Sequence, residues 1–259
     1  MVFARKRFGQ NFLHDAGVIA QIIDAIAPQP GDALLEIGPG RGALTAPLLA
    51  ACGRLDAVEI DRDLAALLRE RLPAPGLVLH EADALEFDFA ALAAERGRKL
   101  RVIGNLPYNV STPLLFRLLQ AHESLLDLHI MLQREVIERI CASPGSSEYG
   151  RLTVMLAPWV VAEHLFDVGP GAFRPAPQVW SAVARLSIRD RPAFAVDQRY
   201  AKLVAAAFSQ RRKTLRHALR PLLDAAAILA CDIDPGARPE TLTPPQFGRL
   251  ASALPNTVA

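Results

Sequence analysis

The sequence predicts an α/β fold built on a parallel sheet, followed by a small all-helical domain, and three observations support this prediction. A short apolar run at residues 33–35 enters a glycine-rich turn that opens onto a new apolar-periodic stretch, the order of strand, tight loop and helix. Short apolar runs then alternate with helical patterns. Strand signals stop beyond residue 192. We therefore predict two domains, residues 1–190 and residues 191–259.

The glycine-rich turn reads Gly38-Pro39-Gly40-Arg41-Gly42-Ala43. Glycines lack a Cβ, so the loop can bend sharply and a ligand can touch its backbone, while the following helix presents unpaired N–H groups. The spacing also fits the loose dinucleotide pattern, so NAD and S-adenosylmethionine are both candidate ligands of a site at Gly38. Glu36 favours S-adenosylmethionine, because a carboxylate repels a pyrophosphate but suits an ammonium or sulfonium group.

The composition indicates a soluble protein with a substantial core, since 51% of the 259 residues are hydrophobic. The amino terminus lacks an apolar signal core, and no apolar run approaches the roughly 20 residues of a membrane span. We expect a cytoplasmic enzyme without membrane attachment. The three cysteines are far apart and the six histidines show no paired spacing, so we expect reduced thiols and no metal site.

The net charge of +2 is unevenly distributed along the chain. Arg5, Lys6 and Arg7 open the sequence without an acidic neighbour, and residues 190–259 carry a net charge of +4. A cluster of cations without interleaved acids lies in the helical part, and it includes Arg211, Arg212, Lys213 and Arg216. Two basic ends around an acidic middle favour a polyanion that is bound from the periphery, with these cations on phosphates.

Taken in order, the first segment, residues 5–15, mixes cations, aromatics and amides before a helix predicted over residues 18–26. Composition leaves two interpretations open. The segment is either a solvated tail that packs two phenylalanines, or a lid in which Asn11 and Leu13 close over a cofactor.

Two carboxylates follow the next predicted strands, at residues 54–60 and 77–80. Glu59, about 20 residues past the glycines, can accept both ribose hydroxyls of an adenosine. Asp83 has two readings: with Glu86 it forms a capping-box-like helix start, and at a strand end it can accept an adenine amino group.

A fourth strand, residues 100–104, runs into the tetrad Asn105-Leu106-Pro107-Tyr108, the most informative group in the chain. Pro107 lacks an N–H and biases Leu106 toward an extended conformation, so the Leu106 carbonyl can point outward beside the Asn105 side-chain oxygen. Two acceptors with the Tyr108 ring as a flat wall suit an exocyclic amine whose base stacks on tyrosine. The alternative is a simple turn before a helix over residues 111–119.

Phe173 precedes a proline-stiffened loop, where it is either a second aromatic wall opposite Tyr108 or a side chain held in the core. The remaining elements are predicted from apolar periodicity and turn signals. They are strands at 128–132 and 182–188, and helices at 133–140, 198–208, 213–223 and 245–254.

With these residues in view, the chain resembles the KsgA (RsmA) family of small-subunit ribosomal RNA adenine N6-dimethyltransferases, relatives of the Erm enzymes. The resemblance runs from Arg5 to about Leu250. It rests on several motifs: residues 7–13, Glu36-Ile37-Gly38-Pro39-Gly40, Val58-Glu59-Ile60-Asp61, residues 104–109, the Phe173-x-Pro-x-Pro loop, residues 211–216 and Arg238-Pro239-Glu240. Gln178 and His217 depart from the residues that the family often has, lysine and asparagine.

The resemblance implies a Rossmann-like class I S-adenosylmethionine-dependent methyltransferase domain, with a basic amino-terminal arm and an RNA-contacting helical domain. Its substrate would be two adjacent adenosines in the hairpin loop near the 3′ end of 16S rRNA within the small ribosomal subunit, and we expect a monomer. The implied cofactor contacts are Asn11, Leu13, Gly38, Glu59, Asp83 and Asn105.

Four alternatives remain at this stage. An Erm-like 23S rRNA methyltransferase shares the chemistry, but the arginine-rich helix in a long carboxyl-terminal domain argues against it. DNA adenine methyltransferases use a similar tetrad, although no sequence-reading domain is evident here. An assembly factor that occupies immature small subunits, with methylation secondary, belongs to a different class. An NAD oxidoreductase has the least support.

Overall fold

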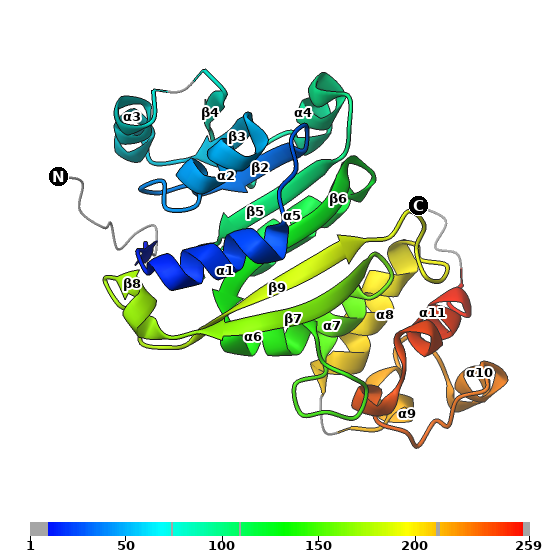
Figure 1. Cartoon of the computed structure of the whole chain (residues 1–259). Coiled ribbons are helices and arrows are strands. Elements are labelled where there is room, and N and C mark those ends of the chain that lie inside the picture. The colour runs from blue at the N-terminus through cyan, green and yellow to red at the C-terminus, as the bar shows by residue number, and fades with distance from the viewer. Residues whose placement is uncertain (1–9, 74, 109, 211–212, 256–259) are drawn as a thin grey trace. The chain divides into compact units, whose positions relative to one another are not determined.

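The structure, a computed structural model, describes residues 10–73, 75–108, 110–210 and 213–255 (Figure 1). It forms two compact units, one with residues up to Ile137 and Glu163–Ile188, the other with Glu138–Ala162 and the residues from Arg189 onward. The carboxyl-terminal part of the second unit starts at Arg189, close to the predicted boundary at residue 191. The unit also includes the earlier residues 138–162. Tyr149 and Val154 of that segment are buried in the same apolar cluster as the carboxyl-terminal helices, which is the physical reason for the difference.

The first unit is built on a sheet in which the described residues form seven strands, in the order β4-β3-β2-β5-β6-β9-β7. Its strands are β2 (Ala33–Ile37), β3 (Leu55–Glu59), β4 (Leu77–Glu81), β5 (Leu100–Asn105), β6 (Leu125–Gln133), β7 (Val160–Val168) and β9 (Ser181–Ile188). The five strands from β4 to β6 pair in parallel, and β9 pairs antiparallel with β6. This arrangement confirms the predicted α/β fold.

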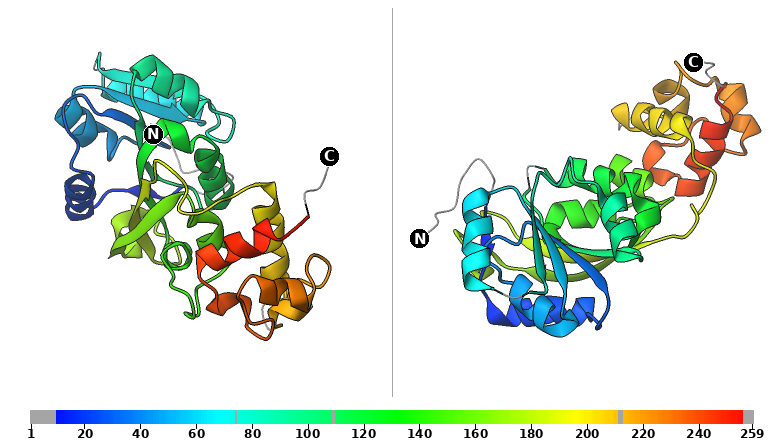
Figure 2. Two further views of the ribbon diagram at one scale, coloured as in Figure 1. Left: turned by 90° about the vertical axis from the view of Figure 1, so that its right-hand side faces the viewer. Right: turned by 90° about the horizontal axis from the view of Figure 1, so that it is seen from above.

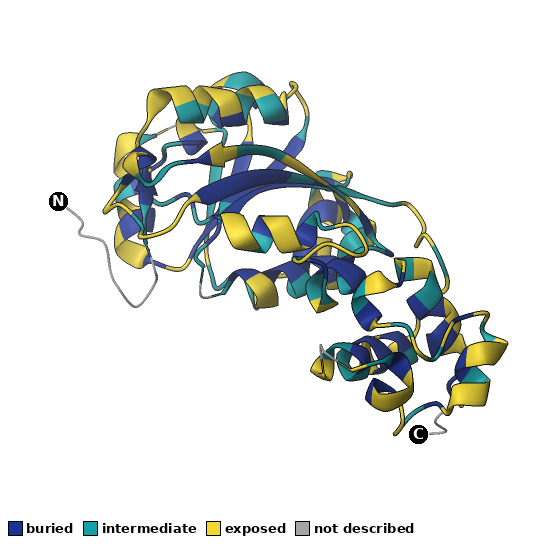
Figure 3. Cartoon of the chain, turned by 90° about the horizontal axis from the view of Figure 1, so that it is seen from below, coloured by how far each residue is buried: buried dark blue, intermediate teal, exposed yellow. Residues whose placement is uncertain are grey.

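The central strands are mostly apolar because both faces of the sheet are covered. Every residue of β2 and β3 is buried, and the middle of the sheet is dark blue in Figure 3. Parallel strands need crossover connections, which place helices on the faces and exclude water from the strands. Near-continuous apolar runs such as Ala33-Leu34-Leu35 are the sequence signature of that environment.

The helices of this unit are α1 (Ala16–Ile26), α2 (Thr45–Cys52), α3 (Arg62–Arg71), α4 (Phe89–Arg96) and α5 (Ser111–Gln120), with the short η2 (His122–Ser124). In the right-hand view of Figure 2, α1 and α2 lie on one side of the sheet and α5 on the other. Ile22, Ile26 and Leu48 from α1 and α2 pack in one cluster with Ile103 and Val183 from the strands. Helix α6 (Arg134–Ile140) follows β6 directly.

A second, two-stranded sheet joins the amino-terminal segment to the proline-containing loop. Strand β1 (Phe12–Leu13) pairs antiparallel with β8 (Phe173–Arg174), which follows η3 (Pro170–Ala172), and Leu13 lies opposite Phe173. The His14 N–H also donates to the Ala172 carbonyl at 2.9 Å.

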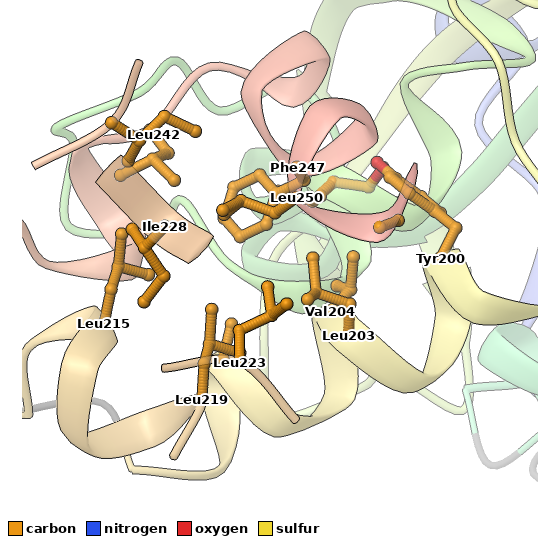
Figure 4. Packing of buried hydrophobic residues seen from close by; sticks show 14 of the residues in the cluster. Tyr200, Leu203, Val204, Leu215, Leu219, Leu223, Ile228, Leu242, Phe247 and Leu250 are labelled. Atoms are coloured by element: carbon orange, nitrogen blue, oxygen red, sulfur yellow. The ribbon is translucent and has the colours of Figure 1, made fainter. Parts of the chain in front are cut away.

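The second unit contains α7 (Arg151–Leu156), α8 (Gln198–Ser209), α9 (Leu215–Ala218), α10 (Ala225–Ala230), η4 (Pro239–Thr241) and α11 (Pro244–Ser252). Its core is apolar, with Leu203, Leu219, Phe247 and Leu250 facing one another in Figure 4. The Tyr200 hydroxyl in this core donates to the Val154 carbonyl, which satisfies its polar end.

One predicted helix was wrong, one of the two interpretations of Asp83 is not observed, and two elements were not predicted. The helix predicted over 213–223 shrinks to α9, because Pro221 lacks an N–H and disfavours helical backbone at Arg220. No helix starts at Asp83; the next one, α4, begins at Phe89 with Asp88 as its cap. Strand β7 and helix α10 were not predicted.

We expect Phe247→Ala to destabilise the protein by about 3–5 kcal/mol, because it deletes a fully buried ring and leaves a cavity in the core of the second unit. Urea unfolding followed by circular dichroism measures the loss. Leu229→Ala is the control: Leu229 is 65% exposed, so its truncation should cost less than about 0.5 kcal/mol. Equal effects of the two changes would contradict this assignment of the core.

Candidate functional site

A cavity of about 240 Å³ opens in the first unit at the carboxyl ends of β2, β3 and β5. Its lining includes all the residues predicted to contact a cofactor and the complete tetrad after β5: Asn11, Leu13, Gly38, Glu59, Asp83, Asn105, Leu106, Pro107 and Tyr108. Parallel pairing explains this convergence, because the carboxyl ends of parallel strands meet at one edge of the sheet.

The glycine loop presents its backbone to this cavity. Gly38 has a φ of 67°, and a Cβ built there would meet nothing within 4 Å, so the space beside it is open. Gly40 has a φ of 58°, and a Cβ there would lie 3.2 Å from the Phe12 ring. Both positions need the left-handed backbone that glycine adopts without strain. The loop can therefore admit a ligand close to its main chain.

Glu59 ties this loop to the end of β3. Its carboxylate accepts the Gly40 N–H at 3.1 Å through Oε2 and the Asp61 N–H at 2.9 Å through Oε1. The side chain is buried, and burial raises the pKa of the Glu59 carboxyl above its usual value. The predicted strand-end carboxylate is thus in place, with both oxygens engaged by backbone.

Glu36 is the most unusual group at the site. The residue is only 2% exposed, and its Oε2 atom has no hydrogen-bond partner among the described residues. Burial raises the pKa of Glu36 to about 7; the nearby Thr45 hydroxyl lowers it in part, and the charge of Glu59 raises it further. A buried carboxyl oxygen without a partner on a cavity wall is suited to a positively charged group.

Asp83 lies on the cavity wall but does not cap a helix. Its Oδ1 accepts the Leu85 N–H at 2.9 Å, which stabilises the turn after β4.

The cavity is completed by apolar side chains that we did not predict as site residues, among them Ile60 and Leu85. The sequence signal for Ile60 was its place directly after Glu59, at the end of a predicted strand; the structure shows it 48% exposed despite its apolar side chain.

The tetrad is held from both sides. The Asn105 Nδ2 donates to the Asn11 carbonyl at 3.0 Å, and the Leu106 N–H donates to the Met131 carbonyl at 3.1 Å. Gly104 allows this close packing, since a Cβ there would come 2.9 Å from the Ile37 carbonyl oxygen.

The residues that carry the two predicted acceptors and the aromatic ring, Asn105, Leu106 and Tyr108, all line the cavity. The Nδ2 bond leaves the Asn105 Oδ1 directed away from Asn11, and no described residue donates a hydrogen bond to the Leu106 carbonyl. The Tyr108 hydroxyl lies 2.7 Å from the Ser181 Oγ, and burial raises the pKa of Tyr108. The ring is thereby pinned at the cavity wall.

Phe173 is not brought to the cavity. Its side chain is 2% exposed in the core cluster that also contains Leu13 and Ile22, and it is not among the residues that line the cavity. In the described structure Phe173 therefore occupies the position of the alternative interpretation, an aromatic side chain held in the core. Pairing with Leu13 in the small sheet holds Phe173 there.

Of the cations predicted to bind RNA, Arg5, Lys6, Arg7, Arg211 and Arg212 lie outside the described residues. Lys213 and Arg216 are exposed on the second unit. In the described part of the chain, no cluster of three or more histidine, cysteine or acidic side chains could hold a metal ion. None of the helices seen there is long and apolar enough to cross a membrane.

Comparison with known proteins places these observations in a family. The family model described as ribosomal RNA adenine dimethylase matches residues 1–254. The chain is 53% identical over 254 residues to the ribosomal RNA small subunit methyltransferase A of Pseudomonas aeruginosa, covering 97% of this chain and 94% of that protein. The corresponding protein of Nitrosococcus oceani is 55% identical over 244 residues, covering 93% and 92%.

Among solved structures, the 23S rRNA methyltransferase ErmE matches with a TM-score of 0.74 and 28% identity, over 94% of this chain and 99% of that one. The fold class predicted from the sequence, a Rossmann-like methyltransferase, is confirmed. The motif-based resemblance is confirmed as well: the chain belongs to the ribosomal RNA adenine dimethylase family.

Proposed function

We propose that this protein transfers methyl groups from S-adenosylmethionine to N6 of two adjacent adenosines, in the hairpin loop near the 3′ end of 16S rRNA, and that it acts on small ribosomal subunits in the cytoplasm as a monomer. One observation carries the proposal: the Asn105–Tyr108 tetrad shares a single cavity with the glycine loop. Membership of the family and the names of the small-subunit relatives support the choice of substrate.

The residues around the cavity fit S-adenosylmethionine. The open backbone beside Gly38 leaves room for the methionine part, and the partnerless Glu36 Oε2 suits its ammonium group. Glu59 and Asp83 would accept the ribose hydroxyls and the adenine amino group, with Asn11, Leu13 and Asn105 closing the site. When bound, this cofactor supplies an electrophilic methyl group on a sulfonium.

The protein's task is then to hold the adenine amine in line with that methyl. The N6 lone pair is delocalised into the ring, which makes the amine a weak nucleophile. Acceptors at the Asn105 Oδ1 and the Leu106 carbonyl would hold the two N–H groups and favour a pyramidal nitrogen whose lone pair faces the methyl. No strong base is needed, because the nitrogen becomes acidic once alkylated and its proton passes to water.

Tyr108 would support the unstacked base. A base stacked on an aromatic side chain gains about 1–3 kcal/mol, and the hydrogen bond to Ser181 fixes the ring in advance. Because Phe173 is buried in one cluster with Leu13, we assign it to the support of Leu13 and not to a contact with the base.

The proposal is tested with purified protein and radiolabelled S-adenosylmethionine on unmethylated small subunits, large subunits, naked rRNAs and duplex DNA, followed by mapping of the label. Dimethyladenosine at the small-subunit hairpin is the expected product. Label confined to 23S rRNA or to DNA would overturn the substrate. Tight binding to small subunits without label would favour the assembly-factor alternative.

Asn105→Ala should lower kcat by at least about 10²-fold, because it removes an acceptor aimed at the amine where charge develops. Binding of S-adenosylmethionine, followed by calorimetry, should remain measurable. Ser111→Ala is a control that removes a hydroxyl bonded to the Tyr108 carbonyl without touching the acceptors. Near-normal turnover in Asn105→Ala would remove that residue from the mechanism.

Glu36→Gln should stabilise the ligand-free protein at neutral and higher pH. The folded-state pKa is raised from 4.5 to about 7, so the stabilising contribution of the protonated carboxyl is full below pH 4.5 and is lost as the pH rises through 7. The variant should therefore gain up to about 3 kcal/mol over the original chain at pH 8, and little at pH 4.5.

Urea unfolding between pH 4.5 and 8 measures this difference, and the exposed Glu86→Gln change should show none of it. The same Glu36→Gln protein should bind S-adenosylmethionine more weakly, since the cation loses its counter-charge. A variant that is less stable at pH 8 than the original chain would contradict the burial of an unpaired carboxylate.

Lys213→Ala combined with Arg216→Ala should weaken binding to small subunits in a salt-dependent way. If each cation neutralises one phosphate, the slope of log affinity against log salt should fall by about 1.5 in magnitude. Filter binding between 50 and 200 mM salt gives the slope. An unchanged slope would place these two cations away from the RNA.

A further inference from the structure

Trp180 is a large aromatic side chain that the structure leaves half exposed, at 50%, immediately before β9. Neither the tetrad nor the cofactor cavity accounts for it, since it is not among the residues that line the cavity. Single exposed apolar side chains are common, so exposure alone decides nothing. Its surroundings and its position are what distinguish it.

The ring is held in a defined orientation. The Arg134 guanidinium carbon lies 6.0 Å from the ring centroid, the Arg134 N–H donates to the Trp180 carbonyl at 2.9 Å, and Asp167 lies 3.7 Å from the same guanidinium. Gly169 packs against the far edge of the ring, where a Cβ would lie 3.7 Å away. The indole is a fixed plate, because its backbone, its edge and its guanidinium neighbour are all engaged.

The Trp180 ring precedes β9 at the same end of the sheet as the tetrad, which follows β5. The next residue, Ser181, bonds the Tyr108 hydroxyl at 2.7 Å and pairs with Gln133 of β6, while Asn105 of β5 pairs with Met131 of the same strand. Strands lie about 4.8 Å apart, so β9 is about 10 Å from β5. If the target adenosine is held at the tetrad, the base of a neighbouring nucleotide can reach across this distance of about 10 Å to Trp180.

The chemistry of the surface favours a base over an apolar protein partner. Val179, 43% exposed, is the other large apolar side chain exposed beside Trp180; the remaining large apolar side chains exposed in the described residues are separate in sequence, at Ile60, Leu126, Val161 and Leu229. This is too small a patch for a protein interface. A flat ring with a guanidinium over one face is a typical platform for an unpaired nucleobase on its other face.

We propose that Trp180 is a stacking platform for an unpaired nucleobase of the RNA that neighbours the target adenosine. The inference rests on the proposed function for the identity of the RNA. Stacking the neighbouring base on Trp180 separates it from the target base and orients the target toward Tyr108. Trp180 is thus a positioning residue that acts on RNA binding and leaves the methyl transfer itself to the tetrad.

The experiment uses fluorescence and kinetics together. The chain has two tryptophans, so Trp159→Phe leaves Trp180 as the sole reporter. Stacking of a base on the indole should quench its emission when unmethylated small subunits, or an RNA hairpin with two adjacent adenosines in its loop, are added. Trp180→Ala in the full chain should raise KM for small subunits about 10-fold, with kcat and S-adenosylmethionine affinity unchanged.

Two variants act as controls. Trp180→Phe keeps an aromatic face and should restore KM to within about 3-fold of the original chain. Leu126→Ala removes an equally exposed apolar side chain from the opposite end of β6 and should change nothing. Thermal unfolding of each variant confirms that it folds.

The outcomes separate the two proposals. If the original chain methylates small subunits while Trp180→Ala has a normal KM and Trp180 is not quenched, the platform is refuted and the proposed function stands. If quenching occurs with small subunits but never with the hairpin, the ring meets another part of the subunit and the inference is also refuted. If nothing is methylated, the proposed function fails, and quenching by the hairpin alone still decides the role of Trp180.

Discussion

Parallel pairing of β2 with β3 on one side and with β5 on the other is the constraint on which the site depends. Ile37 pairs with Val58 and Glu36 with Ile103, so the glycine loop, Glu59 and the tetrad arrive at one edge although they are up to 70 residues apart. Both faces of these strands are buried, and a shift by one residue would turn every side chain to the opposite face. The core therefore enforces the register, and the register assembles the site.

The electrostatics of the site follow from the same burial. Glu36 and Glu59 end in a region from which water is largely excluded, and the charge of Glu59 raises the cost of ionising Glu36. Glu59 is compensated by two backbone N–H groups, whereas the Glu36 Oε2 has no such compensation among the described residues. In the free protein this carboxyl is a local source of instability, and a cationic ligand would remove it. Stability and ligand affinity are thus coupled through one side chain.

The small sheet of β1 and β8 connects the amino-terminal segment to the rest of the site. Leu13 lies opposite Phe173, and the Asn11 carbonyl accepts the hydrogen bond from Asn105, so the segment that closes the cavity and the tetrad share a direct contact. Burial of Phe173 beneath Leu13 holds this closing strand against the core. Phe173, which the sequence offers as a wall for the base, thus lies in the structure behind strand β1.

The sequence alone determined the features that local chemistry specifies: the parallel strands with the helices between them, the glycine loop, the strand-end carboxylates and the tetrad. Apolar runs, glycine and proline act within a few residues, so their patterns are readable without the fold. Only the tertiary structure decided whether Phe173 faces the base or the core, that Asp83 braces a turn, and that residues 138–162 join the helical unit. These outcomes depend on which distant surfaces exclude water together. No short segment carries that information, because burial belongs to the packed chain as a whole.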